Sequence, residues 1–127
     1  MSQFIDGNYK TFIADEAIAV HLRVKLDSDG RVTVAGLTDK DIGTAVSPAF
    51  AAGDNVTVKL RSGAGTHKMV AIEACAIGAR MYTEANGKVQ DTAAQTSFQL
   101  GTALEAAGAD GDIIEVLYDS HGDTAVP

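Results

Sequence analysis

Three histidines and one cysteine are the residues of this chain that offer metal-binding or nucleophilic chemistry. They are His21, His67, His121 and Cys75. Zinc sites in proteins use Cys and His ligands in closely spaced pairs, and no two of these four residues are spaced in that way. Cys75 has apolar neighbours, which are typical of a buried small side chain rather than of an activated thiol. We therefore expect no metal site and no catalytic cysteine.

Two glycine-containing loops have a partial likeness to ligand-binding motifs. The segment Asp27-Ser28-Asp29-Gly30 resembles the opening of a calcium loop, but the later bidentate Glu is missing and a strand follows instead of a helix. The segment GAGTHK at 63–68 lacks the Lys that directly follows the second Gly of a phosphate-binding loop. Since no nucleophile motif occurs either, we predict no catalytic residue, no cofactor and no enzymatic activity.

The elements that would position these residues are strands. From 19 to 26, apolar residues alternate with His21, Arg23 and Lys25, the pattern of a half-buried strand. The turn at 27–30 and the strand 31–34 complete a β-hairpin. Alternation at 56–60 and again at 70–74 predicts a second hairpin, and the pair Asn86-Gly87 predicts a third. Further strands are expected at 98–104 and 113–118, and short helical turns at 47–52 and 105–109.

An internal repeat organises these strands. Shifting the chain by 58 residues aligns IGTAVSPAFAAGDNVTVKL (42–60) with LGTALEAAGADGDIIEVLY (100–118), with eight of 19 positions identical. We predict an all-β fold, a small barrel or compact sandwich with a pseudo-twofold internal repeat and one or two short helical turns. Residues 17–127 are expected to form a single β domain with repeat halves at about 17–61 and 75–118, each half burying its apolar face against the other.

The first 16 residues form an N-terminal arm of different character. Large apolar side chains are concentrated there, at Phe4, Ile5, Tyr9 and Phe12. Two interpretations of this arm remain open. The arm either folds back on its own domain, or it extends and adds its aromatic rings to the surface of a neighbour.

Charge and composition exclude several classes of partner. The 127 residues hold ten Lys and Arg against 17 Asp and Glu, a formal net charge of −7. A protein that grips nucleic acid or an anionic membrane needs the opposite field, and no stretch has the length and apolarity of a membrane span. A single cysteine excludes an internal disulfide and is compatible with a reducing cytoplasm. We expect neither nucleic acid nor membrane as a partner.

With these segments in place, the chain resembles the capsid cement or head decoration proteins of tailed bacteriophages. The likeness lies in TEANGKV, LGTALEAAGADGD and IIEVLY of the second half, and in DSDGRV, IGTA and GDNVTV of the first. It extends from about residue 17 to 118. The motifs consist of small residues and strands, so they indicate the family and say nothing about chemistry.

The resemblance implies a protein that binds the outer surface of the phage head and stabilises contacts between major capsid subunits. It implies manufacture in the cytoplasm of the bacterial host and self-association, as a homotrimer or a homodimer. Within this picture we assign Phe4, Ile5, Tyr9 and Phe12 of the arm to capsid binding, although the arm is the part least similar to the family. The alternative is a virion-surface β-barrel module that recognises a carbohydrate or a host-surface ligand.

Overall fold

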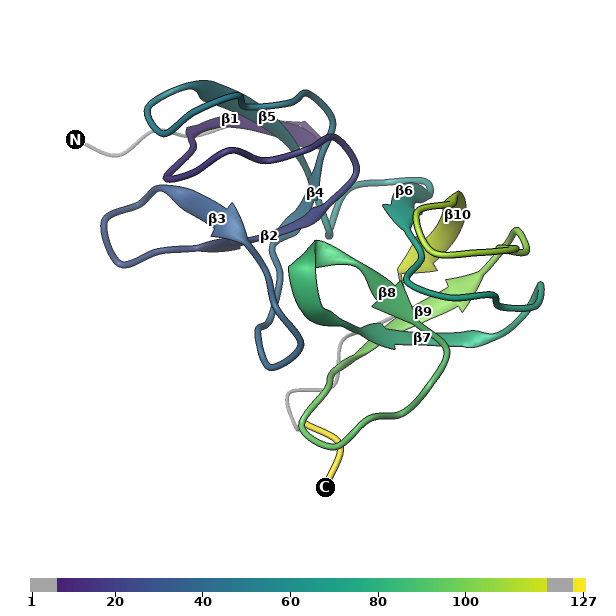
Figure 1. Ribbon diagram of the computed structural model, residues 1–127. Coiled ribbons are helices and arrows are strands. Elements are labelled where there is room, and N and C mark those ends of the chain that lie inside the picture. The colour runs from purple at the N-terminus through teal and green to yellow at the C-terminus, as the bar shows by residue number, and fades with distance from the viewer. Residues whose placement is uncertain (1–6, 119–124) are drawn as a thin grey trace.

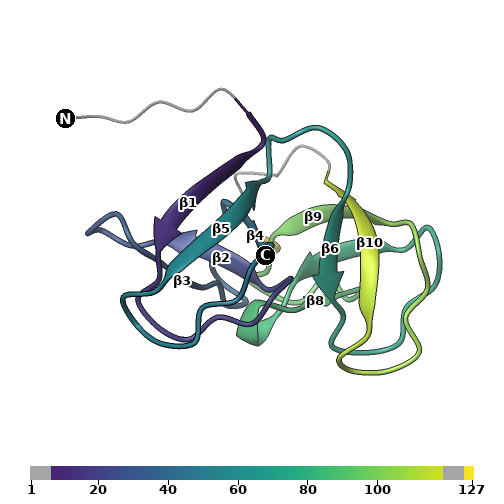
Figure 2. The ribbon, with the colours of Figure 1, turned by 90° about the horizontal axis from the view of Figure 1, so that it is seen from above.

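The computed structural model of the chain describes residues 7–118 and 125–127 and is built from short β-strands (Figures 1 and 2). In chain order, the first five are β1 (Tyr9–Ile13), β2 (Arg23–Leu26), β3 (Val32–Val34), β4 (Gly43–Ala45) and β5 (Asn55–Leu60). The next five are β6 (His67–Val70), β7 (Arg80–Thr83), β8 (Val89–Gln90), β9 (Gln99–Ala103) and β10 (Ile113–Tyr118). One 3-10 turn, η1 (Ala85–Gly87), joins β7 to β8. The all-β prediction is confirmed.

Two antiparallel five-stranded sheets repeat one topology. The first has the order β1-β5-β4-β2-β3 and the second the order β6-β10-β9-β7-β8, so each strand has a counterpart five places later in the chain. We call them the N-lobe (residues 9–60) and the C-lobe (residues 67–118). Even isolated bridges recur, since Ala14 pairs with Val32 in one lobe as Ala71 pairs with Val89 in the other. The internal repeat is therefore real, and its copies begin at β1 and β6.

Neither sheet closes into a barrel, so a compact sandwich is the alternative that the structure supports. The expectation of one core shared between the halves is wrong, because each lobe packs its own apolar cluster. The N-lobe core includes Val24, Val56 and Val58, and the C-lobe core includes Met81 and Val116. Each sheet is curved, and the residue that follows its first strand makes a single bridge to the opposite edge strand, Ala14 to Val32 and Ala71 to Val89, without a continuous ladder that would close a barrel.

Two of the three predicted hairpins are present. β2 pairs with β3, and β7 pairs with β8 around the Asn86-Gly87 turn. The second predicted hairpin is wrong, because β5 and β6 belong to different sheets. Both edges of β5 are already hydrogen-bonded to β1 and β4, so the loop after it crosses to the C-lobe. The strand expected from residue 19 begins only at Arg23, since His21 has a φ of 71° that interrupts extended backbone.

The Gly-Asp pair that ends each Ala-rich loop has a clear structural role. In the N-lobe, Asp54 Oδ2 accepts hydrogen bonds from the backbone N–H groups of Phe50 and Ala51. In the C-lobe, Asp112 Oδ2 does the same for Gly108 and Ala109. These side chains fold the loops as bends, so the short helical turns expected at 47–52 and 105–109 do not form there.

Candidate functional site

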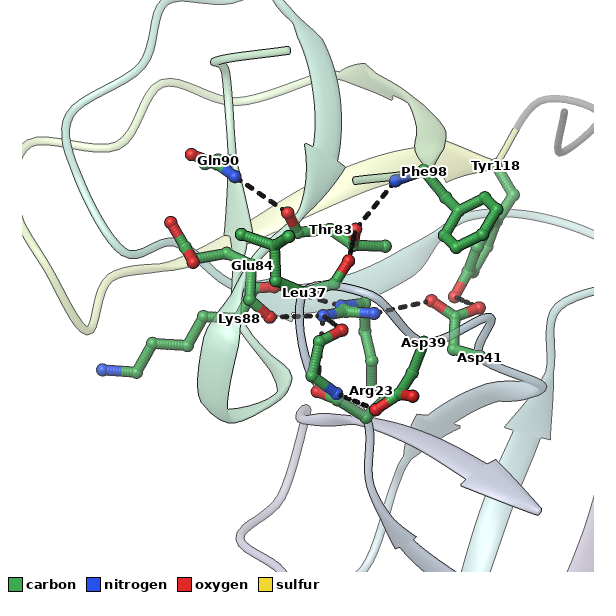
Figure 3. A network of polar contacts seen from close by, with 12 residues as sticks. Arg23, Leu37, Asp39, Asp41, Thr83, Glu84, Lys88, Gln90, Phe98 and Tyr118 are labelled. Carbon is green, nitrogen blue, oxygen red and sulfur yellow. Dashed lines mark hydrogen bonds and ion pairs between the residues drawn. The ribbon is translucent and has the colours of Figure 1, made fainter. Parts of the chain in front are cut away.

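A buried polar joint fixes the two lobes to each other (Figure 3). Its centre is Arg23 of β2, which the structure buries completely. Arg23 Nη1 pairs with Asp41 Oδ2 at 3.2 Å within the N-lobe. Toward the C-lobe, Arg23 Nη2 donates to Glu84 O at 2.6 Å and Nε donates to Lys88 O at 3.0 Å. The guanidinium therefore binds both ends of the turn between β7 and β8, an arrangement suited to its fan of donors.

Backbone contacts complete the joint. The Gly87 N–H donates to Ala35 O at 2.8 Å, and Thr83 Oγ1 donates to Leu37 O at 2.6 Å. A Cβ on Gly87 would lie 2.9 Å from Leu22 Cβ and 2.9 Å from Val34 Cγ1, so only glycine fits there. The C-lobe turn is thus docked in the N-lobe surface, and the relative position of the lobes follows from these contacts.

His67 and Tyr118 extend this joint on the C-lobe side. The His67 and Tyr118 rings meet edge to face with centroids 4.6 Å apart, and Tyr118 Oη donates to Asp41 Oδ1 at 3.0 Å. Burial raises the pKa of Tyr118 well above 10, so the phenol stays protonated as a donor. His67 Nε2 lies 3.1 Å from Leu60 O, whereas the buried Nδ1 has no hydrogen-bond partner among the described residues.

Burial lowers the pKa of His67 from its ordinary value of 6.5, which predicts acid sensitivity of the fold. The unfolded chain binds this proton near pH 6.5 and the folded chain only at lower pH. The free energy of unfolding is therefore highest above pH 6.5 and falls as the pH drops from there toward the folded pKa. Thermal unfolding followed between pH 7 and pH 5 measures this loss. The variant His67→Gln is expected to be less stable than the wild type at pH 7. It should lose less stability than the wild type when the pH is lowered to 5. If stability depends on pH in the same way in this variant as in the wild type, His67 is not the cause of the acid sensitivity.

One edge of the molecule carries the loops of both repeats. The loops from β4 to β5 and from β9 to β10 lie along the lower edge in Figure 2, opposite the linker between β5 and β6. Phe50, in the N-lobe loop, is 82% exposed, and Ile77, between β6 and β7 of the C-lobe, is 71% exposed. Beside Phe50, the loop residues Val20, Leu22 and Pro48 line a mainly apolar pocket of about 590 Å³. The segment that holds Ile77 is bridged to the loop between β9 and β10 through Cys75 and Ala107. We call Phe50, Ile77 and this pocket the loop edge.

The four arm residues predicted to bind a capsid have different surroundings. Phe4 and Ile5 lie outside the described residues. Tyr9 and Phe12 belong to β1, which is paired with β5 at the margin of the N-lobe sheet. Tyr9 is half exposed, whereas Phe12 packs against the N-lobe core. Of the two described residues, only Tyr9 is therefore exposed for a contact, and the role of the four residues in capsid binding stays a prediction.

A cleft of about 450 Å³ between the lobes is lined by polar side chains, including His21, Lys59 and Glu115. Lys59 and Glu115 are engaged with the protein itself. Lys59 Nζ donates to Thr66 O at 2.5 Å, and Thr66 Oγ1 donates to Glu115 Oε2 at 2.6 Å. Burial, and then the charge of Lys68, lower the pKa of His21. The cleft contacts therefore hold the two lobes together.

The suspected calcium-like turn does bring carboxylates together. Asp15, Asp27 and Asp29 place oxygen atoms within 4.8 Å of one another. A hydrogen bond with the Asp15 carboxyl, followed by burial and the charges of Asp15 and Asp29, raises the pKa of Asp27. Arg31 lies 3.6 Å from Asp15 and offsets part of this charge. Asp29 is exposed and Asp15 and Asp27 are partly exposed, and exposed acidic groups are common on protein surfaces without a bound ion.

Sequence reasoning missed the two residues on which the joint depends. Alternation correctly placed Arg23 opposite Val24, but it assigned that face to solvent, and the C-lobe turn covers it. Gly87 was predicted only to form a hairpin turn. One signal was available: Asp29 precedes the tip glycine of the first hairpin, whereas the corresponding residue of the second turn is the neutral Asn86. A turn that is buried against protein needs such a neutral tip.

The two five-stranded antiparallel sheets define an all-β protein. The family model described as "Phage cement protein" matches residues 42–118, which is more than half of the chain. The chain belongs to this family of phage cement proteins, so the resemblance seen in the sequence is confirmed. It is a structural protein associated with the phage head and hence with the virion.

A solved structure supports the fold. The crystal structure of the head fiber gp8.5 N base in bacteriophage phi29 superimposes with a TM-score of 0.71 at 17% sequence identity. The match covers 87% of this chain and 92% of that one. No curated protein sequence matches the chain. Within the described residues, no helix has the length and apolarity needed to cross a membrane.

Proposed function

We propose that this chain binds the outer surface of the assembled phage head and stabilises contacts between major capsid subunits, acting as a homodimer or homotrimer. The observation that carries this proposal is the loop edge. The Ala-rich loops of both lobes lie along one side of the molecule, Phe50 is exposed on the first, and Ile77 is exposed on the segment bridged to the second. Isolated exposed apolar residues are common on proteins. An aromatic ring beside an apolar pocket, however, is typical of a protein interface.

The rest of the structure keeps this edge rigid. Asp54 and Asp112 hold the two Ala-rich loops, and the Arg23 joint fixes one lobe relative to the other. A preorganised surface loses little conformational entropy on binding, so a small apolar contact retains more of its affinity. Several copies attached at once strengthen binding further through effective concentration. This suits a protein that bridges neighbouring subunits of a shell.

The arm is proposed to add a second contact. Tyr9 is exposed on β1 and is suited to this role together with Phe4 and Ile5. Phe12, which packs against the N-lobe core, supports the contact by holding β1 on the sheet. Its contribution to capsid binding is therefore indirect. The variant Tyr9→Ala tests this contact separately from the loop edge.

The proposal is tested with phage heads that lack this protein. Purified chain is added to such heads and sedimented with them, and the thermal stability of the decorated heads is compared with that of bare heads. Wild-type protein is expected to bind and to raise the temperature at which the heads break open. Replacing Phe50 and Ile77 by Ser is expected to weaken binding about tenfold or more, the range of an interface hot spot. Because both side chains are exposed, the variant should keep the unfolding temperature of the wild type.

Leu117→Ser is the matched control, because Leu117 is also an exposed apolar residue and lies on β10 near the opposite edge. It should bind as the wild type does. If the wild type, the variant with Phe50 and Ile77 replaced by Ser, and Leu117→Ser bind equally well, the loop edge is not the surface that binds the head. A wild-type chain that fails to bind bare heads, or that binds glycans and leaves head stability unchanged, would overturn capsid stabilisation and favour a virion-surface binding module.

A further inference from the structure

The two copies of the hairpin differ in what covers them. In the C-lobe, the tip residue Gly87 is buried against the N-lobe, and a Cβ there would meet three atoms within 3.1 Å. In the N-lobe, the corresponding tip residue Gly30 is exposed, and a Cβ there would meet nothing within 4 Å. Figure 1 shows the β2–β3 hairpin projecting away from the C-lobe, whereas η1 reaches the N-lobe. One hairpin is therefore docked within the chain and its equivalent is not.

The surface that receives the docked hairpin also occurs twice. Arg23 begins β2 and pairs across the sheet with Thr44, and Arg80 begins β7 and pairs with Thr102 in the same way. Arg23 is fully buried by the C-lobe turn, whereas Arg80 is exposed. Thr92, which corresponds in the repeat to Ala35 beneath the docked turn, is exposed as well. The C-lobe thus carries a second copy of the receiving surface, which we call the Arg80 face.

The charges of the exposed hairpin and the Arg80 face are complementary. The N-lobe hairpin holds Asp27 and Asp29, with Asp15 beside them. Arg31 pairs with this trio through Asp15 at 3.6 Å, and the charge of Lys25 also acts on Asp27. A second guanidinium would relieve the mutual repulsion of the carboxylates and form charge-assisted hydrogen bonds with them. The Gly30 N–H already donates to Asp27 O at 3.0 Å, so such a contact relies on the carboxylates rather than on the bond that Gly87 makes.

We propose that the β2–β3 hairpin of one copy of this chain docks on the Arg80 face of a second copy. In this contact, the N-lobe hairpin of one chain docks on the C-lobe of the next chain, just as the C-lobe turn docks on the N-lobe within a chain. The contact is head to tail, so repeated contacts produce either a closed ring or an open chain. This inference specifies the self-association included in the proposed function, and it does not depend on the contact with the capsid.

Analytical ultracentrifugation of the full chain over a range of concentrations tests the proposal. Wild-type protein is expected to associate. Arg80→Glu and Asp29→Arg are each expected to weaken association about tenfold or more, because each places like charges opposite one another. Ser28→Arg, at the exposed tip, should weaken it without removing the hydrogen bond from Arg31 N to Asp29 Oδ1. The double variant Arg80→Glu with Asp29→Arg restores an opposite-charge pair between positions 80 and 29 in every head-to-tail contact. Asp15 and Asp27 remain, so association should recover in part and exceed that of either single variant.

Lys68→Glu, which reverses an exposed cation of β6, is the control and should associate as the wild type does. Thermal unfolding of each variant verifies that it is folded. The proposal is overturned if the wild type stays monomeric, if the single variants associate normally, or if the double variant remains monomeric. Binding to bare heads separates this result from the capsid proposal. Phe50→Ser should weaken head binding but keep self-association, whereas Arg80→Glu should weaken self-association but keep the contact of each single copy with the head.

Discussion

Replacing Arg23 by Met is expected to destabilise the protein by about 3–5 kcal/mol, the range for breaking a buried ion pair from one side. The Met side chain fills similar space but leaves the Asp41 carboxylate buried without its cation. It also removes the donors that bind Glu84 O and Lys88 O across the lobe joint. Chemical denaturation of wild type and variant gives this difference in the free energy of unfolding directly.

Arg80→Met is the matched control, since Arg80 occupies the same position in the repeat but is exposed. It is expected to change the free energy of unfolding by less than about 0.5 kcal/mol, as is usual for surface substitutions. Measurements at dilute concentration keep both proteins monomeric. Asp41→Asn, and the double variant with Arg23→Met, complete a double-mutant cycle that isolates the coupling between the two side chains. Similar effects at Arg23 and Arg80 would mean that the joint is not a stabilising element.

The Arg23 joint also shows why the sequence predicted the lobes better than their arrangement. Alternation depends on neighbours along one strand, so it located β10 at 113–118 and placed Val24 inside. Whether the opposite face of β2 meets water or protein depends on a turn 60 or so residues away, and alternation carries no such information. For the same reason the loop at 62–65 was read as a hairpin, although the edges of β5 were already occupied.

The sequence predicted that the protein has a surface for contact with a capsid, but it did not predict which residues form the loop edge. The repeat located the Ala-rich loops, and the resemblance indicated a surface that meets a capsid. Large apolar residues are concentrated at Phe4, Ile5, Tyr9 and Phe12, and this concentration predicts a binding surface in the arm. Phe50 is a single ring among alanines, so composition did not distinguish it, and its exposure follows from the bend that Asp54 imposes. Side chains of a small domain become informative as binding residues only when their burial is known.

Gly87→Ala is expected to disrupt the docking of the C-lobe turn on the N-lobe. Its φ is 73°, so any side chain there costs about 1–2 kcal/mol of backbone strain. The new Cβ would also lie 2.9 Å from Leu22 Cβ and from Val34 Cγ1, which adds about 1–3 kcal/mol of overpacking. Both atoms belong to the opposite lobe, and the turn is held there by the Gly87 N–H and by Arg23. The turn must therefore move, and the joint must loosen with it.

Gly30→Ala separates the two causes, because Gly30 has the same place in the repeat and a φ of 84°, but open space around it. Gly30→Ala should lower the free energy of unfolding by the backbone strain alone. The difference between the two variants then measures what the contact between lobes contributes. Amide hydrogen exchange gives a second measurement, in which Gly87→Ala should expose the amide of residue 87 and leave the strands of both sheets protected. Equal stability of the two variants would contradict docking of the C-lobe turn, because backbone strain is common to both and only the contact with Leu22 and Val34 distinguishes them.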